Sequence, residues 1–265
     1  MTGSGGLAVV TGASSGIGAA FSRLLAAEGR PVLLVSRSGG RLEALATELN
    51  AGRVGRAEIL AADLGTPAGR DAVWNATEGA GRPVALLVNN AGFGLNGPET
   101  DLPFERVHAL LELNVVATAE LTHRFLVAMK ARGAGAILNV SSTSAFYPTP
   151  YFSLYGASKA FILNFTHALH EEANSLGVTV TCLCPGFTNT NFAAVAGMKG
   201  GEATPFPVMT AETVAKVVLE AVRKRKAVAV VHPLDRLWIA AGRLVPRGVP
   251  ARFGARFFKK TRLYR

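Results

Sequence analysis

Short runs of aliphatic residues recur along the chain and are separated by longer stretches with helical spacing. The runs do not alternate strictly with polar residues, which is typical of strands that are buried on both faces. Strands are expected at Leu7–Val10, Pro31–Val35, Ile59–Ala61, Val84–Val88, Ala136–Val140, Val178–Cys184 and Ala227–Val231.

Between these runs, apolar residues return every three or four positions, which is the period of an amphipathic helix. Helices are expected at Ala19–Glu28, Leu42–Leu49, Phe104–Lys130 as two helices, Leu154–Leu176 and Ala211–Arg223. Alternation of strand and helix, repeated about seven times, predicts a doubly wound, Rossmann-type α/β fold. We expect a parallel sheet of about seven strands with helices on both faces.

Length and composition agree with one large domain. The chain has 265 residues, 49% of them hydrophobic, and this is enough to bury a single core. It contains two cysteines, no evident signal peptide and no apolar run long enough to span a bilayer. We therefore expect a soluble, cytoplasmic protein.

The net charge of +10 is concentrated in one part of the chain. Residues 1–222 carry 15 basic and 17 acidic side chains, whereas residues 223–265 carry 13 basic side chains and one acidic, Asp235. Because the larger part is nearly neutral, nucleic-acid binding is not expected. We divide the chain after the last predicted strand, into a Rossmann-type domain at 1–231 and a basic, amphipathic C-terminal extension at 232–265.

The extension contains two amphipathic pieces separated by Pro246 and Pro250. In the first, an apolar stripe lies opposite Arg236 and Arg243; in the second, Phe253 and Phe257 accompany Arg252, Arg256 and Lys259. The stripes could dock on the protein itself, or they could lie on an anionic membrane surface. We favour docking on the protein, because amphipathic helices usually face a core. The stripe of the first piece consists of Leu234, Leu237, Trp238, Ala241 and Val245.

A glycine-rich turn follows the first predicted strand. The sequence Thr11-Gly12-Ala13-Ser14-Ser15-Gly16-Ile17-Gly18 leads into a helix, and its three glycines would let the backbone approach a pyrophosphate at the helix N-terminus. The spacing is not that of the commoner dinucleotide fingerprint or of a Walker loop. An ordinary turn between strand and helix is the alternative interpretation.

The second predicted strand ends at Ser36 and Arg37, about 20 residues after the glycines, which is the place where dinucleotide-binding folds select their cofactor. A carboxylate at this place binds a ribose 2′-hydroxyl, whereas arginine accommodates a 2′-phosphate. The pair therefore favours NADP(H) over NAD(H), unless Arg37 is an ordinary surface cation.

Tyr155 and Lys159 are four residues apart and share a face of a predicted helix. A nearby ammonium favours the phenolate, so Lys159 is expected to lower the pKa of Tyr155 from its ordinary value of about 10. Ser141 and Ser142 follow the strand that ends at Val140, at the sheet edge where α/β folds place their sites.

Together these motifs resemble the short-chain dehydrogenase/reductase family over about residues 5–231. The resemblance implies that Tyr155 is the general acid or base and that Ser142 stabilises the carbonyl oxygen. It implies that Lys159 binds the nicotinamide ribose and that Asn114 positions a water. The motifs that carry it, in the family's order and spacing, are Thr11–Gly18, Asn89-Asn90-Ala91-Gly92, Asn114, Ser142, Tyr155 with Lys159, and Pro185-Gly186.

The resemblance also implies a set of cofactor contacts, which assigns residues 1–231 as an NADP(H)-binding and catalytic domain. The implied contacts are Gly12, Ser14, Ser15, Gly16, Ile17, Gly18, Ser36, Arg37, Asp63, Leu64, Asn90, Ala91, Gly92, Tyr155, Lys159, Pro185, Gly186, Thr188 and Thr190.

Aromatic residues near these motifs predict an apolar substrate pocket, although they could instead pack in the core or at a subunit interface. The segment Asn191–Met209 has the composition of a mobile lid. No metal site is expected, because Cys182 with Cys184 and His167 with His170 lack further ligands at suitable spacing. The candidate pocket residues are Phe93, Ser144, Phe146, Tyr151, Phe152, Phe187 and Phe192.

We therefore expect an NADPH-dependent carbonyl reductase, or alcohol dehydrogenase in reverse, for an apolar or aromatic ketone. A 3-oxoacyl-thioester reductase of the same family is the alternative. A non-catalytic NADP(H)-sensing regulator is a more distant one, because it would not need Ser142, Tyr155 and Lys159. The resemblance implies a homodimer or homotetramer, and peripheral membrane contact through the extension is less favoured than docking.

Overall fold

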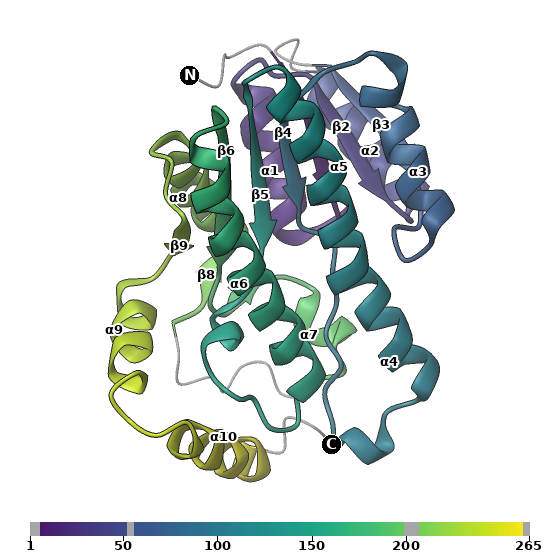
Figure 1. Cartoon of the computed structure of the whole chain (residues 1–265). Helices are drawn as coiled ribbons and strands as arrows, with labels where there is room; N and C mark the ends of the chain where they lie inside the picture. The colour runs from purple at the N-terminus through teal and green to yellow at the C-terminus, as the bar shows by residue number, and fades with distance from the viewer. Residues whose placement is uncertain (1–5, 52–55, 199–206, 262–265) are drawn as a thin grey trace.

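Seven parallel strands form the centre of the computed structural model, which describes residues 6–51, 56–198 and 207–261 (Figure 1). The strand order is β3-β2-β1-β4-β5-β6-β9, so the winding reverses between β1 and β4. The predicted doubly wound fold is confirmed. The strands are β1 (Leu7–Thr11), β2 (Val32–Ser36), β3 (Ala57–Ala61), β4 (Val84–Asn89), β5 (Gly135–Val140), β6 (Val178–Cys184) and β9 (Val228–Val230).

Helices cover both faces of the sheet. Residues of α1, α2 and α8 pack on one face, and residues of α3, α5 and α6 pack on the other. Neighbouring residues of β1 point into different cores, because Ala8 and Val10 belong to the first core and Leu7 and Val9 to the second. These main helices are α1 (Gly16–Ala27), α2 (Gly39–Ala51), α3 (Pro67–Asn75), α5 (Ala117–Ala131), α6 (Ser153–Asn174) and α8 (Ala211–Arg223).

All the expected helices are present, and α3 was not expected. The stretch predicted as two helices forms α4 (Phe104–Leu111) and α5, joined by a π-helical turn at Glu112–Val116. The shorter elements lie between the main ones along the chain. They are α7 (Phe192–Val195), the paired strands β7 (Thr188–Asn189) and β8 (Met209–Thr210), and 3₁₀ helices at Glu78–Ala80, Glu99–Asp101 and Thr143–Phe146.

A buried polar network fixes α5 and α6 on the sheet. The side-chain amide of Asn89 on β4 donates to Oδ1 of Asn139 on β5 (2.9 Å) and to the Thr122 hydroxyl on α5 (3.0 Å). The amide of Asn139 donates to the Thr166 hydroxyl on α6 (3.1 Å). Hydrogen bonds of fixed geometry in a dry core oppose sliding of the helices. The network therefore fixes the position of α6 along the sheet, and with it the position of the N-terminal half of α6 at the sheet edge.

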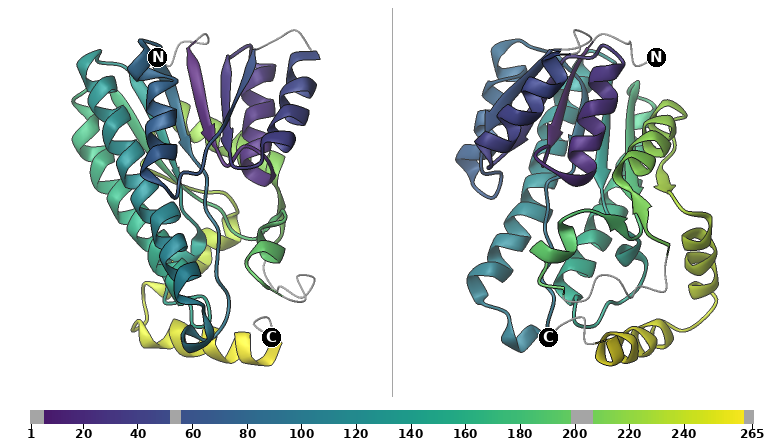
Figure 2. Two further views of the ribbon diagram at one scale, coloured as in Figure 1. Left: turned by 90° about the vertical axis from the view of Figure 1, so that its right-hand side faces the viewer. Right: turned by 180° about the vertical axis from the view of Figure 1, so that it is seen from behind.

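The extension forms α9 (Pro233–Gly242) and α10 (Gly248–Thr261), and Pro250 lies inside the first turn of α10. In Figures 1 and 2, α9 descends beside the sheet and α10 crosses the end of the molecule opposite the N-terminus. Among the described residues, no helix combines the length and apolarity needed to cross a bilayer. The side chain of Phe257, which was expected on an apolar stripe, lies outside the described residues.

The prediction of which face of α9 docks was wrong. Leu234, Leu237 and Trp238 of the predicted stripe are exposed, whereas Asp235 and Ile239 are buried. A Cβ on Gly242 would lie 2.3 Å from the Tyr147 ring, so this glycine permits close approach of α9 to the loop that follows β5. The docking face is therefore decided by close contact with a shaped surface, which a helical wheel does not represent.

Candidate active site

The turn after β1 needs its glycines. Gly12 and Gly16 have φ angles of +64° and +55°, in the left-handed region that other residues rarely adopt. A Cβ on Gly18 would lie 2.4 Å from the Gly12 carbonyl oxygen. Ser15 occupies the N-cap of α1, but its side chain forms no capping hydrogen bond. The first amides of α1 are thus directed at the open side of the turn, where an anion is stabilised.

Thr11 and Asn90 fasten this turn to the end of β4. The Thr11 hydroxyl accepts hydrogen bonds from the N–H groups of Asn90 (2.9 Å) and Ala91 (3.0 Å) and donates to the Val88 carbonyl (3.2 Å). The Asn90 side chain donates to the Thr11 carbonyl (2.9 Å). The sequence analysis identified Thr11 only as the first residue of the glycine-rich motif and predicted no role for its side chain. The structure gives it a distinct role as the brace between the two central strands.

An open cleft of about 360 Å³ lies beside the glycine turn. A Cβ on Gly16 would lie 3.0 Å from the side chain of Thr190, so the segment after β6 closes directly over the turn. Two stretches that are far apart in the sequence, both expected to bind cofactor, therefore face one cleft. Its lining consists of Ser15, Gly16, Arg23, Asn189, Thr190, Asn191, Thr210, Ala211 and Glu212.

Two cations lie at the rim after β2. The Arg37 guanidinium has a side chain 70% exposed and lies 3.9 Å from the Asp63 carboxylate. Ser36 accepts a hydrogen bond from the Ser38 N–H (3.1 Å), and Arg41 donates to the Ser38 hydroxyl (3.1 Å). Arg41 was not a sequence candidate. The available signal was its position one helical turn after Arg37.

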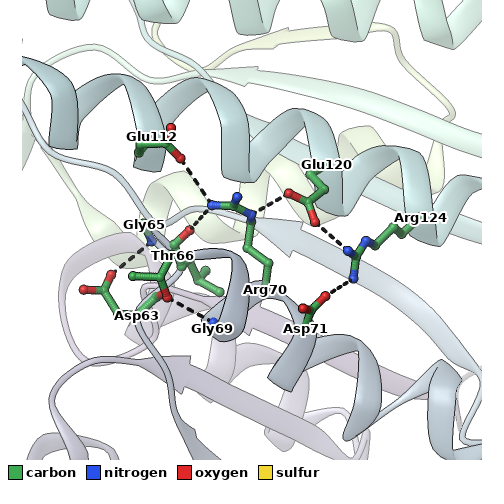
Figure 3. A network of polar contacts seen from close by, with 10 residues as sticks. Asp63, Gly65, Thr66, Gly69, Arg70, Asp71, Glu112, Glu120 and Arg124 are labelled. Carbon is green, nitrogen blue, oxygen red and sulfur yellow. Dashed lines mark hydrogen bonds and ion pairs between the residues drawn. The ribbon is translucent and has the colours of Figure 1, made fainter.

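The loop after β3 is held in place by the buried cation of Arg70 (Figure 3). Arg70 donates to the carbonyl of buried Leu64 (3.1 Å) and forms ion pairs with Glu120 (2.5 Å) and Glu112 (3.5 Å). Glu120 pairs in turn with Arg124 (2.7 Å). Glu112 begins the π-helical turn, so Arg70 joins the loop expected to contact the cofactor to the turn that contains Asn114. Sequence reasoning missed Arg70, because its two acidic partners are 42 and 50 residues away along the chain.

Asn114 lies fully buried in the π-helical turn and holds the chain that leaves β4. Its side-chain amide donates to the Phe93 carbonyl (2.9 Å), and its Oδ1 accepts from the Phe93 N–H (3.1 Å). The amide also donates to the Ser158 hydroxyl on α6 (3.2 Å). A Cβ on Gly92 would lie 2.9 Å from Asn114 Oδ1 and 3.5 Å from Lys159 Nζ. Gly92 therefore lets the chain pass between the two side chains.

Ser142 lies at the sheet edge, where β5 gives way to the 3₁₀ helix. Its hydroxyl caps that helix by accepting from the Ser144 N–H (3.1 Å) and contacts the Ser144 hydroxyl (3.2 Å). The hydroxyl is also hydrogen-bonded with Tyr155, on the first turn of α6. The structure thus brings Ser142, Tyr155 and Lys159 together, as expected from their spacing.

Burial dominates the protonation of both α6 residues. It raises the pKa of Tyr155 to about 12, and the hydrogen bond with Ser142 opposes this only in part. It lowers the pKa of Lys159 to about 8; the ammonium donates to the Val140 carbonyl (2.8 Å) and lies 5.6 Å from the centre of the Tyr155 ring. The expected lowering of the Tyr155 pKa is therefore reversed, because the loss of water outweighs the hydrogen bond with Ser142. The phenol is neutral near pH 7.

Tyr155 faces an apolar cluster made of residues from five separate parts of the chain. Its ring centre lies 4.4 Å from that of Phe152 and 5.3 Å from that of Phe192. Phe258 of α10 packs in the same cluster and was not a sequence candidate. The cluster consists of buried Leu95, Leu110, Phe152, Tyr155 and Ala196 and of partly buried Phe93, Leu102, Val107, Leu154, Phe192, Met198 and Phe258.

The other candidate pocket residues are dispersed. Phe146 packs against Ile162 and the two cysteines of β6, in a different cluster. Phe187 is 37% exposed. Tyr151 has a φ of +64°, and its carbonyl accepts from the Gly97 N–H (2.8 Å). Residues 199–206 of the expected lid, including Phe206, lie outside the described residues.

The extension reaches the segment after β6, which is expected to contact the cofactor. Pro185 is buried at the end of β6, and the Thr188 hydroxyl donates to the Gly186 carbonyl (3.1 Å). A Cβ on Gly186 would lie 2.3 Å from an Asp235 carboxylate oxygen. Asp235 is buried, and burial raises its pKa. The glycine thus allows α9 to pack directly behind this segment.

Residues 6–199 match a family model described as short chain dehydrogenase. A very-long-chain 3-oxoacyl-CoA reductase from Anas platyrhynchos is 34% identical over 209 residues, which are 77% of this chain and 66% of that protein. The chain thus spans slightly less than two thirds of this relative.

Two solved structures are similar over most of their length. One is a short-chain dehydrogenase from Sphingobium yanoikuyae in complex with NADPH, with a TM-score of 0.82, 31% identity and coverage of 93% of this chain and 95% of that one. The other, from Burkholderia phymatum, is a short chain dehydrogenase/reductase in complex with NAD, with a TM-score of 0.80, 26% identity and coverage of 89% and 92%.

Proposed function

Because the chain belongs to the short-chain dehydrogenase/reductase family, we propose that it is an NADPH-dependent carbonyl reductase, or an alcohol dehydrogenase in reverse. One observation carries the proposal. A neutral, buried phenol at Tyr155 is hydrogen-bonded to the Ser142 hydroxyl and lies beside the Lys159 ammonium and an apolar cluster. This arrangement supplies a proton and hydrogen bonds at the same place where it excludes water.

The residues of the turn fit a dinucleotide. A pyrophosphate requires backbone N–H groups at close range, and any Cβ at Gly12 or Gly18 would lie within 3 Å of neighbouring atoms. We assign the turn from Gly12 to Gly18 to the pyrophosphate, Asn90–Gly92 to the floor of the cofactor site, and Pro185–Thr190 to the nicotinamide amide. When bound, the nicotinamide supplies the hydride.

The protein's own part in the reaction is to provide hydrogen bonds and a proton. In reduction, Ser142 donates to the carbonyl oxygen and stabilises its developing charge, and Tyr155 transfers its phenolic proton to that oxygen. Burial keeps the proton on Tyr155 near pH 7, which is the form a general acid needs. Lys159 stands under the ring as a cation that favours the phenolate left after transfer. Asn114 forms hydrogen bonds with the Phe93 backbone and thereby fixes the chain segment beside the site.

The rim after β2 supports NADPH as the cofactor. Arg37 and Arg41 provide two guanidinium groups, against a single carboxylate at Asp63. A guanidinium binds a phosphate in bidentate geometry, and that contact is lost with NADH. We propose that Arg37 binds the 2′-phosphate and that Arg41, through Ser38, lines the same position. The relatives include one solved with NADPH and one with NAD, so the preference has to be measured on this chain.

The cluster around Tyr155 supports an apolar or aromatic ketone as substrate. Phe152, Phe192 and Phe93 are grouped with the proton donor in one apolar cluster. A second candidate, a 3-oxoacyl thioester, has the same reacting carbonyl. It is favoured by the name of the Anas platyrhynchos relative, a very-long-chain 3-oxoacyl-CoA reductase.

We further propose that residues 1–231 are the catalytic domain and that residues 232–265 are an extension of it. Exposed Phe104, Val116, Val127 and Phe161 on the surfaces from α4 to α6 support self-association of the chain through these helices. Free buried thiols at Cys182 and Cys184 support a reducing, cytoplasmic location.

The proposal is tested by oxidation of NADPH and NADH with a panel of aliphatic, aromatic, steroid and acyl-thioester ketones. Tyr155→Phe should lower kcat at least ~100-fold, because it removes the general acid, while NADPH binding measured by fluorescence stays intact. Tyr147→Phe is the matched control, since its buried hydroxyl has no hydrogen-bond partner among the described residues. Equal activity of Tyr155→Phe and wild type would remove Tyr155 from the mechanism, and a preference for NADH would refute the role of Arg37.

A further inference from the structure

Large exposed apolar side chains are concentrated on α9, α10 and their connection. Within the described residues, seven of the sixteen such side chains lie between Leu234 and Phe253. Leu237, Trp238, Leu244 and Phe253 are 65%, 58%, 87% and 63% exposed. Single exposed apolar residues are ordinary on protein surfaces, but a contiguous group marks a place of interaction. We call the outward side of α9, α10 and their connection the tail face.

The tail face is also basic. Arginine and lysine side chains lie exposed between the apolar ones, and Asp235, the one carboxylate from 233 to 261, is buried on the inner side. On α10, Val249 and Phe253 share the outer side with cations one turn apart. The exposed cations are Arg236, Arg243, Arg247, Arg252, Arg256 and Lys259.

The inner sides of both helices are anchored, so the tail face has a fixed orientation. Ile239 and Asp235 are buried on the inner side of α9, and Asp235 lies against Gly186. On α10, Phe258 packs in the cluster beside Tyr155, and a Cβ on Gly254 would lie 3.4 Å from Pro150. The outward side is therefore the part of α9 and α10 that stays exposed after their inner sides have packed on the protein. Figure 2 shows α10 lying across one end of the molecule.

We propose that the tail face docks on an anionic lipid surface, with Leu237, Trp238, Leu244 and Phe253 in the headgroup region and the arginines on lipid phosphates. An interfacial segment inserts Trp, Phe and Leu side chains at the headgroup boundary and carries Lys and Arg side chains that attract anionic lipid, and the tail face has both kinds of residue. Tryptophan is favoured at the membrane–water interface. The proposal does not depend on the reaction that the site catalyses.

The combination of exposed cations and exposed apolar side chains favours a lipid surface over a second copy of the chain or a nucleic acid. Two copies pairing through this face would bring their six exposed cations together with no exposed carboxylate from the same segment. A nucleic acid would neutralise the cations, but aliphatic Leu237 and Leu244 would gain nothing from its backbone. An anionic bilayer satisfies both kinds of side chain, and the face lies where no element of the described fold covers it.

The test uses the full chain and vesicles made of equal parts phosphatidylglycerol and phosphatidylcholine. We expect co-sedimentation with these vesicles and a blue shift of tryptophan emission, because Trp238 is exposed in the free protein. Binding should weaken as salt is raised, since exposed charges are screened beyond about 10 Å at 0.1 M salt. Vesicles of phosphatidylcholine alone should bind much more weakly.

Two pairs of substitutions separate the contributions. Arg247→Glu with Arg252→Glu should weaken vesicle binding at least ~25-fold, from about a fivefold loss for each charge near an anionic surface. Lys130→Glu with Lys216→Glu makes the same change in net charge on α5 and α8 and should have little effect. Leu237→Ser with Leu244→Ser should abolish the blue shift, whereas Ile59→Ser with Val127→Ser should preserve it. Thermal melting checks that each variant is folded.

Three results would overturn the proposal. One is failure of the wild-type chain to bind anionic vesicles at low salt. Another is equal loss of binding in the tail and control charge variants, which would indicate net charge alone. The third is a dimer in analytical ultracentrifugation that the Leu237→Ser, Leu244→Ser variant converts to monomer, which would assign the face to a second copy of the chain.

Discussion

The two halves of the site are held in place by different kinds of interaction. The cofactor half, around the turn after β1, is fixed by backbone: glycine φ angles, close approach at Gly18 and hydrogen bonds from Thr11 and Asn90. The substrate half, around Tyr155, is fixed by packing of aromatic rings from the loop after β4, the start of α6, α7 and α10. Backbone constraints tolerate few residue types, whereas an apolar cluster tolerates many. The first half should therefore be intolerant of substitution and the second adjustable.

The largest effect is expected beneath the cofactor half, at Arg70. Arg70→Met would leave Glu120 and Glu112 without their buried cation, and removing one partner of a buried ion pair typically costs about 3–5 kcal/mol. Both carboxylates are partly exposed, so we expect the lower end of this range in urea denaturation. Arg124→Met, on the outer side of the same network, is the control and should cost less than about 1 kcal/mol. Equal losses in the two variants would contradict a buried role for Arg70.

Next in size is the effect of a single methyl group in the turn. Gly18→Ala places a Cβ 2.4 Å from the Gly12 carbonyl, so the turn must shift away from the pyrophosphate position. NADPH binding should weaken at least ~100-fold, about 2.7 kcal/mol, measured by fluorescence titration. Gly40→Ala, where a Cβ would meet no atom within 4 Å, should bind NADPH as wild type does. A ketone KM that rises while NADPH affinity stays constant would show that the halves are not separate.

A smaller effect, a gain and not a loss of stability, is expected from substitution of Lys159, which lies between the two halves of the site. The pKa of Lys159 falls from 10.5 to about 8 on folding, so the folded chain releases a proton that the unfolded chain retains between about pH 8 and 10.5. The contribution of Lys159 to the free energy of unfolding therefore rises with pH through that window. Below about pH 8 its full unfavourable value remains. Lys159→Met should therefore raise the free energy of unfolding near neutral pH by about 2 kcal/mol, less than the ~3 kcal/mol of the pKa difference, because the hydrogen bond to Val140 is lost.

The measurement is urea denaturation of wild type and Lys159→Met at several pH values, without nucleotide. The stabilisation should shrink as the pH rises from about 8 toward 10. The Tyr155 phenol has the opposite linkage, since its pKa is raised to about 12 and the folded chain keeps its proton after the unfolded chain has lost it. That contribution to stability is lost only above about pH 10. A gain from Lys159→Met that does not change with pH would mean that Lys159 is not desolvated.

The smallest effect is expected in the substrate half. Phe258→Ala removes one ring from the cluster beside Tyr155, and KM for an apolar ketone should rise about tenfold with NADPH affinity unchanged. Phe253→Ala, one turn earlier and exposed, should leave KM as it is in the absence of lipid. If both variants raise KM alike, the effect comes from loosening of α10 and not from a pocket contact.

The same difference explains what could be predicted from sequence. Gly12, Gly16 and Gly18 were identifiable because a left-handed φ or a close backbone approach restricts the residue type. Tyr155 and Lys159 were identifiable because one helical turn relates them. The doubly wound fold followed from apolar runs buried on both faces. In each case the constraint is local to the chain or to one element.

What was missed depends on contacts between distant elements. Phe258 and Arg70 reach the site from α10 and α3, and neither carries a local signal. The pKa of Tyr155 was predicted in the wrong direction because spacing shows the neighbouring charge and not the depth of burial. Asp235 lies on the docking side of α9 because glycine at position 186 leaves room for it. Complementary shape of this kind exists only after folding.

The contacts of α9 and α10 also bear on how the protein is made. Asp235 packs behind Gly186, and Phe258 completes the cluster beside Tyr155, yet both follow β9 in the chain and leave the ribosome after the whole sheet has been synthesised. A nascent chain that has emerged only through β9 holds every residue of its nucleotide turn, but the cluster beside Tyr155 still lacks Phe258. Such partly folded chains are prone to association through exposed apolar surface. Synthesis of α9 and α10 is therefore the step at which the nascent chain covers the apolar cluster beside Tyr155.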